Sequence, residues 1–145
     1  MTHKYALLAV GELLADFIGI EIADDISTTE RFQRFQGGSP SNLAANMARL
    51  GNTTAIVACV GDDNLGKYLV EKVRETGVDV SHIIVEKQEP TSIVIVARSK
   101  ATPDFIAYRT ADRMIRPKHI SDELDRKSTR LNSSHITPSR MPSSA

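Results

Sequence analysis

The sequence lacks three features, and each lack excludes a class of protein. Its single cysteine, Cys59, excludes an internal disulfide and a multi-cysteine zinc site, and is typical of the reducing cytosol. Eighteen basic residues balance eighteen acidic ones, so the charge indicates neither a nucleic acid nor an anionic membrane as partner. The longest apolar runs are far shorter than the roughly 20 residues of a membrane span, and the N-terminus has no signal-peptide pattern. We expect a cytoplasmic protein.

The sequence does contain enough apolar residues for a packed core, but they are distributed unevenly. Of the 145 residues 41% are hydrophobic and 25% are charged, as in globular domains. Residues 1–124 carry 14 basic and 17 acidic side chains, whereas residues 125–145 carry four basic and one acidic, with six serines. The apolar residues of this second part have no period, and two prolines interrupt any helix. We predict a domain over 1–124 and a disordered tail over 125–145.

The tail also resembles something other than a natural protein segment. Residues 125–135 and 139–145 read like the translation of a common sequencing adapter, and residues 136–138 stand where a sample barcode would lie. Two matching segments in the correct order argue against chance. We therefore expect an adapter-derived tail and a natural sequence that is interrupted near Leu124, with a natural Ser-rich disordered tail as the alternative.

The remaining sequence alternates between apolar runs and helical periods. The continuous apolar run over 5–10 is typical of a buried parallel strand. In the helical segments, apolar residues such as Leu65, Leu69 and Val73 recur on one face. By these criteria we predict strands over 5–10, 54–60 and 81–85 and helices over 40–50 and 65–76, with another helix beginning in 117–124. This order predicts an α/β layer with a parallel sheet.

Two regions fit this layer poorly. Extended pieces are indicated over 17–22 and 31–35, and two strands over 91–97 and 105–109 are joined by a short turn, as in a hairpin. We expect them to form a small separate antiparallel flap, with its strands within about 17–35 and 91–109.

The most informative stretch, residues 37–44, reads Gly-Gly-Ser-Pro-Ser-Asn-Leu-Ala. Adjacent Gly37 and Gly38 before a helix allow the backbone to approach a ligand closely. Asn42, in the first turn, offers a donor and an acceptor to vicinal hydroxyls. A tight turn in which Asn42 only caps the helix is the alternative. The segment matches neither a Walker phosphate loop nor the dinucleotide-binding fingerprint.

Two other polar positions are better explained by structure than by chemistry. Cys59 lies in the middle of a predicted strand with apolar neighbours, as expected of a small core side chain. The Asp62-Asp63 pair resembles a metal site only superficially, because carboxylates before a helix complement its N-terminus.

Segment 37–44, with Gly51 and Gly61 following at the matching spacings, resembles the N-terminal signature of the PfkB/ribokinase family of sugar kinases. Residues 10–16, 60–66 and 76–79 resemble further landmarks of the family, and residues 105–112 are similar to the lid of its fructokinases. The resemblance covers about residues 5–124. It implies the ribokinase-like fold, a three-layer α/β sandwich that is incomplete here, with a small β-sheet lid that closes over the sugar.

The resemblance also implies roles for particular residues. Asp16 would accept hydrogen bonds from sugar hydroxyls, and Gly37, Gly38 and Asn42 would line the same pocket. A loop aspartate exposed to solvent is the alternative for Asp16. Arg109, and equally Tyr108, would reach the substrate from the lid, with an ordinary surface residue as the alternative. A homodimer through the lid is implied for the whole kinase.

The resemblance further implies ATP and Mg²⁺ as cofactors of the whole kinase. In the family the catalytic aspartate, the glycine-rich anion hole and the nucleotide pocket belong to the C-terminal half. No Gly-Ala-Gly-Asp run occurs in the 145 residues. We therefore expect no catalytic, ATP-binding or Mg²⁺-binding residue in this chain, and no kinase activity from the chain alone.

The expected reaction of the whole kinase is phosphorylation of a primary hydroxyl of a small sugar, with fructose as the first choice. Ala107 stands where kinases for 2-keto-3-deoxygluconate tend to have a second aromatic residue. That sugar acid, 5-dehydro-2-deoxygluconate, ribose and nucleosides are the alternatives. A non-catalytic sugar-binding module and a nonfunctional truncated product are the alternatives of another class.

Overall fold

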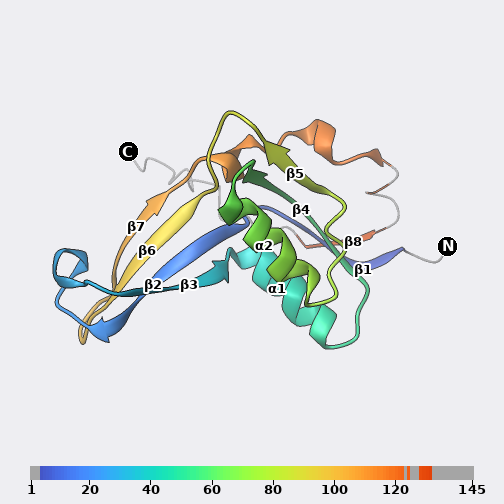
Figure 1. Cartoon of the computed structure of the whole chain (residues 1–145). Coiled ribbons are helices and arrows are strands. Elements are labelled where there is room, and N and C mark those ends of the chain that lie inside the picture. Colours follow the sequence, from blue (N-terminus) through green and yellow to red (C-terminus); the bar gives the residue numbers. More distant parts are fainter. Residues whose placement is uncertain (1–3, 123, 125–127, 132–145) are drawn as a thin grey trace, which may run out of the picture.

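The computed structural model describes residues 4–122, 124 and 128–131, and has two β-sheets (Figure 1). One sheet lies beside two α-helices, and the other extends away from them. The strands are β1 (Tyr5–Val10), β2 (Leu14–Ile22), β3 (Phe32–Gly37), β4 (Thr54–Gly61), β5 (Ile83–Glu86), β6 (Ile93–Arg98), β7 (Asp104–Tyr108) and β8 (Ser128–Leu131). The α-helices are α1 (Ser39–Arg49) and α2 (Asn64–Arg74), and the 3₁₀ helices are η1 (Ile26–Thr28), η2 (Ala111–Met114) and η3 (Pro117–His119).

The first sheet has the strand order β5-β4-β1-β8, and all of its pairs are parallel. Every residue of β4 is buried, which explains its nearly uninterrupted apolar sequence. Its side chains alternate between two cores, with Ile56 in one and Val57 in the other. Cys59 is buried in this strand, so the prediction of a core cysteine is confirmed.

The helices α1 and α2 cover one face of this sheet. Ala44 and Ala45 of α1 are fully buried, and their small side chains let the helix lie close to the strands. Leu69 and Val73 of α2 complete the core on this face. Leu124, with partly buried Ile115 and Ile120, packs against the core on the other face. No helix among the described residues is long and apolar enough to cross a membrane.

The second sheet, which we call the lid, has the order β3-β2-β6-β7. The strands β6 and β7 fall within the predicted range 91–109, whereas β2 begins before and β3 ends after the predicted range 17–35. The expectation of a purely antiparallel flap is wrong, because the central pair β2 and β6 is parallel. These strands leave the α/β layer in the same direction, and each then pairs antiparallel with an outer strand.

The segment after the lid differs from the prediction in two places. In 117–124 a 3₁₀ turn, η3, comes first, because the Ile120 N–H bonds to the carbonyl of Pro117; Asp122 and Leu124 are helical. Ser128–Leu131, expected in a disordered tail, forms β8 on the edge of β1. The unpaired backbone groups of that edge provide the partners. The rest of the expected adapter-derived tail, 125–127 and 132–145, lies outside the described residues.

Asp63 anchors the lid to the α/β layer. Its carboxylate caps α2 by accepting the Gly66 N–H at 2.7 Å, as expected for a carboxylate before a helix. The same group accepts the Thr91 N–H at 2.8 Å and the Thr91 hydroxyl at 2.7 Å, just before β6 begins. Asp63 therefore fixes the point where β6 leaves the layer.

Replacing Asp63 with Ala should lower the free energy of unfolding by about 2–4 kcal/mol, because the helix cap and the buried Thr91 partners are lost together. Asp62→Ala is the matched control, since Asp62 is exposed and its hydrogen bond to the Glu86 carbonyl comes from its backbone N–H. The control should change stability by less than about 0.5 kcal/mol. Urea unfolding followed by circular dichroism measures both, and equal effects would contradict the anchor.

Candidate sugar-binding site

Asp16 lies on β2, where the lid joins the α/β layer. It pairs with Phe35 of β3 and Val94 of β6, so the loop position considered as an alternative is wrong. Its carboxylate is half-buried and has no hydrogen bond or ion pair with another described residue. Burial raises the pKa of Asp16 above its ordinary value. A half-buried acceptor without a partner is ready to bind the hydroxyls of a ligand.

Gly37 and Gly38 leave room for this carboxylate and for the chain beside it. A Cβ atom on Gly37 would lie 2.3 Å from Asp16 Oδ2, so a larger residue would displace the carboxylate from this position. A Cβ atom on Gly38 would lie 2.3 Å from the carbonyl oxygen of Glu12. Gly38 also has a φ of +103° and is the N-cap of α1. The two glycines therefore set the distance between three segments of the site.

Asn42 lies in the first turn of α1 but does not cap it. Its side-chain oxygen accepts the amide N–H of Gln36 at 3.0 Å, and Gln36 also donates to the hydroxyl of Ser41 at 2.8 Å. The Ser41 hydroxyl in turn bonds to the carbonyls of Gly37 and Gly38. These bonds orient the exposed Asn42 amide. Among the described residues, the Asn42 side chain is hydrogen-bonded to Gln36 and not to Asp16 or Arg109.

Arg109 follows β7 and points to two carboxylates. Its Nε donates to Asp112 Oδ2 at 2.6 Å and its Nη2 donates to the same oxygen. Nη2 also lies 3.8 Å from Glu12 Oε2. The hydrogen bond with Asp112 raises the pKa of Arg109. Arg109 is therefore held in place by its ion pairs, and its role in binding a substrate stays a prediction.

Ser92 connects this ion pair to the strand that carries Asp16. The buried Ser92 hydroxyl donates to Asp112 Oδ1 and accepts the Thr110 N–H at 2.9 Å. The Ser92 carbonyl accepts the N–H of Ala15, the neighbour of Asp16, at 3.1 Å. Asp16, Ser92 and Arg109 thus belong to one connected junction.

Sequence reasoning missed four residues of this junction, namely Glu12, Gln36, Ser92 and Asp112. The hairpin predicted over 91–109 could have indicated that Ser92 lies near Arg109. In the observed register Ile93 pairs with Tyr108, which brings Ser92 opposite Arg109. The sequence has no comparable signal for Glu12, which reaches Arg109 from a separate segment. Tyr108 is exposed, and its side chain forms no hydrogen bond with another described residue.

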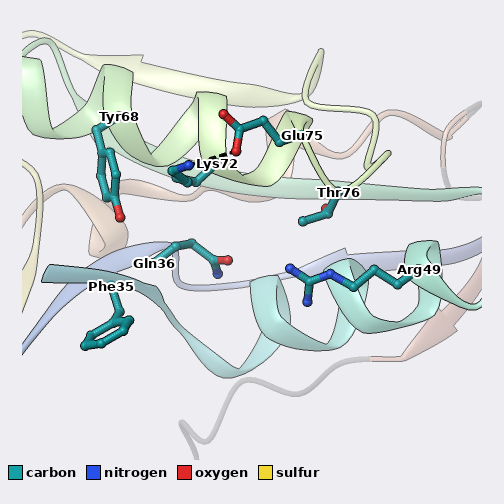
Figure 2. A pocket seen from close by; sticks show the side chains of 7 residues that line it. All are labelled: Phe35, Gln36, Arg49, Tyr68, Lys72, Glu75 and Thr76. Carbon is teal, nitrogen blue, oxygen red and sulfur yellow. Dashed lines mark hydrogen bonds and ion pairs between the residues drawn. The ribbon is translucent and has the colours of Figure 1, made fainter.

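A cavity of about 470 Å³ lies near the site but does not include it (Figure 2). It lies between α2, which contributes Tyr68 and Lys72, and the segment of β3 and α1 that contributes Gln36 and Arg49. Lys72 is paired with Glu75. Gln36 is the link, since its amide bonds to Asn42 while its side chain lines the cavity. Asp16, Gly37, Gly38 and Arg109 are not among the lining residues, so the polar junction is separate from this cavity.

The junction combines an unpartnered carboxylate, an oriented amide, a guanidinium and two glycines that permit close approach. Donors and acceptors of this kind form hydrogen bonds with molecules that have several hydroxyl groups. With an α/β layer and a lid sheet on either side, it defines the ribokinase-like class of small-molecule kinases.

The chain belongs to the pfkB family of carbohydrate kinases, whose family model matches residues 5–143. The match extends beyond Leu124, where we expected the family-like sequence to end. The predicted family and ribokinase-like fold are confirmed. Members of this family are phosphotransferases.

Two relatives show how widely the substrates of similar proteins differ. An ATP-dependent 6-phosphofructokinase of Thermoanaerobacterium thermosaccharolyticum is 40% identical over 83% of this chain and 36% of its own length. A 5-dehydro-2-deoxygluconokinase of Geobacillus kaustophilus is 32% identical over 94% of this chain and 42% of its own. The chain therefore spans about two fifths of these relatives.

Two solved structures agree with the fold. The fructokinase of Halothermothrix orenii has a TM-score of 0.73 at 34% identity, covering 76% of this chain and 40% of its own. A sugar kinase of Pyrococcus horikoshii, solved in complex with ATP, has a TM-score of 0.78 at 31% identity, covering 82% and 39%.

Proposed function

We propose that this chain supplies the sugar-binding part of an ATP-dependent kinase that phosphorylates a primary hydroxyl of a small carbohydrate, with fructose as the first candidate. The observation that carries the proposal is the Asp16 carboxylate, half-buried above Gly37 and without a partner among the described residues. A charged acceptor binds a hydroxyl more strongly than a neutral one does. Asn42, in the helix that follows Gly38, and Arg109, linked through Asp112 and Ser92 to the strand of Asp16, add hydrogen-bond donors.

The alternative substrates are the sugar acids 5-dehydro-2-deoxygluconate and 2-keto-3-deoxygluconate. The relative from Geobacillus kaustophilus, named for the first of these, favours that alternative. Three observations favour fructose. Ala107 stands in place of a second aromatic residue, the fold is similar to the fructokinase of Halothermothrix orenii, and two carboxylates already pair with Arg109.

ATP and Mg²⁺ are the cofactors proposed for the whole kinase. Within the part of the chain that the structure describes, no group of three or more His, Cys, Asp or Glu side chains is placed to hold a metal ion. The Gly-Ala-Gly-Asp run of the family does not occur in the sequence. We infer that both groups bind outside the described residues, and we assign the chain the binding and orientation of the sugar, in the cytoplasm.

The lid is proposed as the dimer interface. Ile20 and Ile22 of β2 and Phe105 of β7 are 48%, 59% and 64% exposed, and the strand register places them on one face. A second copy would cover this apolar face. Sedimentation velocity should show a dimer of the unsubstituted chain and a monomer of the Phe105→Asp variant. A monomeric unsubstituted chain would contradict the proposal.

Titration of the chain with fructose by isothermal calorimetry tests the sugar site. We expect saturable binding in the millimolar range, and no ATP turnover above background when ATP, Mg²⁺ and fructose are all present. Absence of fructose binding by a folded sample would contradict the proposed sugar site. ATP-dependent formation of a fructose phosphate would contradict the expected lack of a catalytic base.

A further inference from the structure

In the chain without substrate, the positive charge of Arg109 is already paired with two carboxylates, those of Asp112 and Glu12. Asp112 is almost fully buried, with 1% of its side chain exposed, and Glu12 is 15% exposed. Both carboxylates face the same guanidinium, which is 24% exposed. Together with Asp16, the described residues of the junction carry three carboxylates and one guanidinium. This half of the site is therefore net negative.

The geometry of the pair also determines which donors of Arg109 stay available. A carboxylate or phosphate ligand is bound best through two parallel N–H groups of one edge of the guanidinium. The edge formed by Nε and Nη2 already donates to Asp112 Oδ2. Asp112 cannot turn away, because the Ser92 hydroxyl donates to its other oxygen and the Asp112 N–H bonds to Ser92 Oγ at 3.2 Å.

We infer that Asp112 and Glu12 are specificity-determining residues that make Arg109 a donor to hydroxyl groups, so that the site selects a neutral sugar over a sugar acid or a sugar phosphate. The inference rests on the proposed function, and deepens it by naming the charge class of the substrate. The inference predicts a substrate different from those for which two relatives are named, a 6-phosphofructokinase and a 5-dehydro-2-deoxygluconokinase.

The test compares the affinity of the full 145-residue chain for three ligands: fructose, fructose 6-phosphate and 2-keto-3-deoxygluconate. Calorimetry at low ionic strength should show fructose binding at least about tenfold more tightly than either anion. Glu12→Gln and Asp112→Asn should each shift this ratio toward the anions by about tenfold. Glu71→Gln is the matched control, because it removes one carboxylate from an exposed pair with Arg74 and should leave the ratio unchanged.

The ratio distinguishes selectivity from structural damage, since a folding defect weakens all three ligands alike. If Asp112→Asn does not fold, Glu12→Gln keeps the test valid, because Glu12 is only partly buried. Tighter binding of either anion by the parent chain, or an unchanged ratio in Glu12→Gln, would overturn the inference and leave the sugar kinase proposal standing. Failure of all three ligands to bind would overturn the proposed function itself, and the inference with it.

Discussion

Asp16→Asn should weaken fructose binding by about a hundredfold or more, because two charge-assisted hydrogen bonds to the sugar become neutral ones. The same substitution should make the free chain more stable. Its carboxylate is half-buried with no partner among the described residues, so the folded state bears the cost of its desolvation. An asparagine of the same shape removes that cost. Loss of function with a gain of stability is the pattern of a binding residue.

The pH dependence of stability gives a second measure of the same residue. Burial raises the pKa of Asp16 in the folded chain above the ordinary 3.8. The folded state therefore holds this proton more tightly than the unfolded state. Protonated Asp16 therefore stabilises the folded chain. This contribution to the free energy of unfolding is fully present below pH 3.8 and is lost as the pH rises through the pKa of Asp16 in the folded chain. This part of the pH dependence of stability should disappear in Asp16→Asn.

Asp24→Asn is the matched control, because Asp24 is an exposed aspartate beyond the end of β2. It should preserve fructose affinity. Calorimetry measures binding, and urea unfolding at several pH values measures stability. An Asp16→Asn chain that binds fructose normally, or that loses stability at neutral pH, would contradict the role of Asp16.

The sequence predicted the parts of the fold whose signals are local. The α/β layer follows from apolar runs and helical periods, and the cap at Asp63 follows from its place before α2. The parallel pairing of β2 with β6 was missed because nearly eighty residues separate strands whose pairing depends on how each leaves the layer. β8 was missed because its pairing depends on the free edge of β1 more than on its own residues.

The candidate site divides in the same way. Asp16, the two glycines and Asn42 were identified from a contiguous motif and the strand before it. Asp112 was noted only as part of a family pattern, since its role depends on the register that brings Ser92 beside it. The specificity of the junction thus resides in contacts between segments, which a linear motif does not record.

Gly38→Ala should have the largest effect on folding of any single methyl addition in the site. Gly38 has a φ of +103°, where an alanine is strained by about 1–2 kcal/mol. The added Cβ would also lie 2.3 Å from the Glu12 carbonyl oxygen, a backbone atom that cannot rotate away. Together these costs should reach about 3–5 kcal/mol, a large part of the stability of a small domain.

Gly51→Ala separates the two contributions. Gly51 also has a positive φ, +87°, but a Cβ atom there meets nothing within 4 Å. It should therefore lose only the strain, about 1 kcal/mol. Urea unfolding of both variants gives the difference, which measures how closely Glu12 must approach the start of α1. Equal losses would contradict that packing. A larger loss for Gly38→Ala would indicate that the Glu12 backbone packs closely against Gly38 at the start of α1.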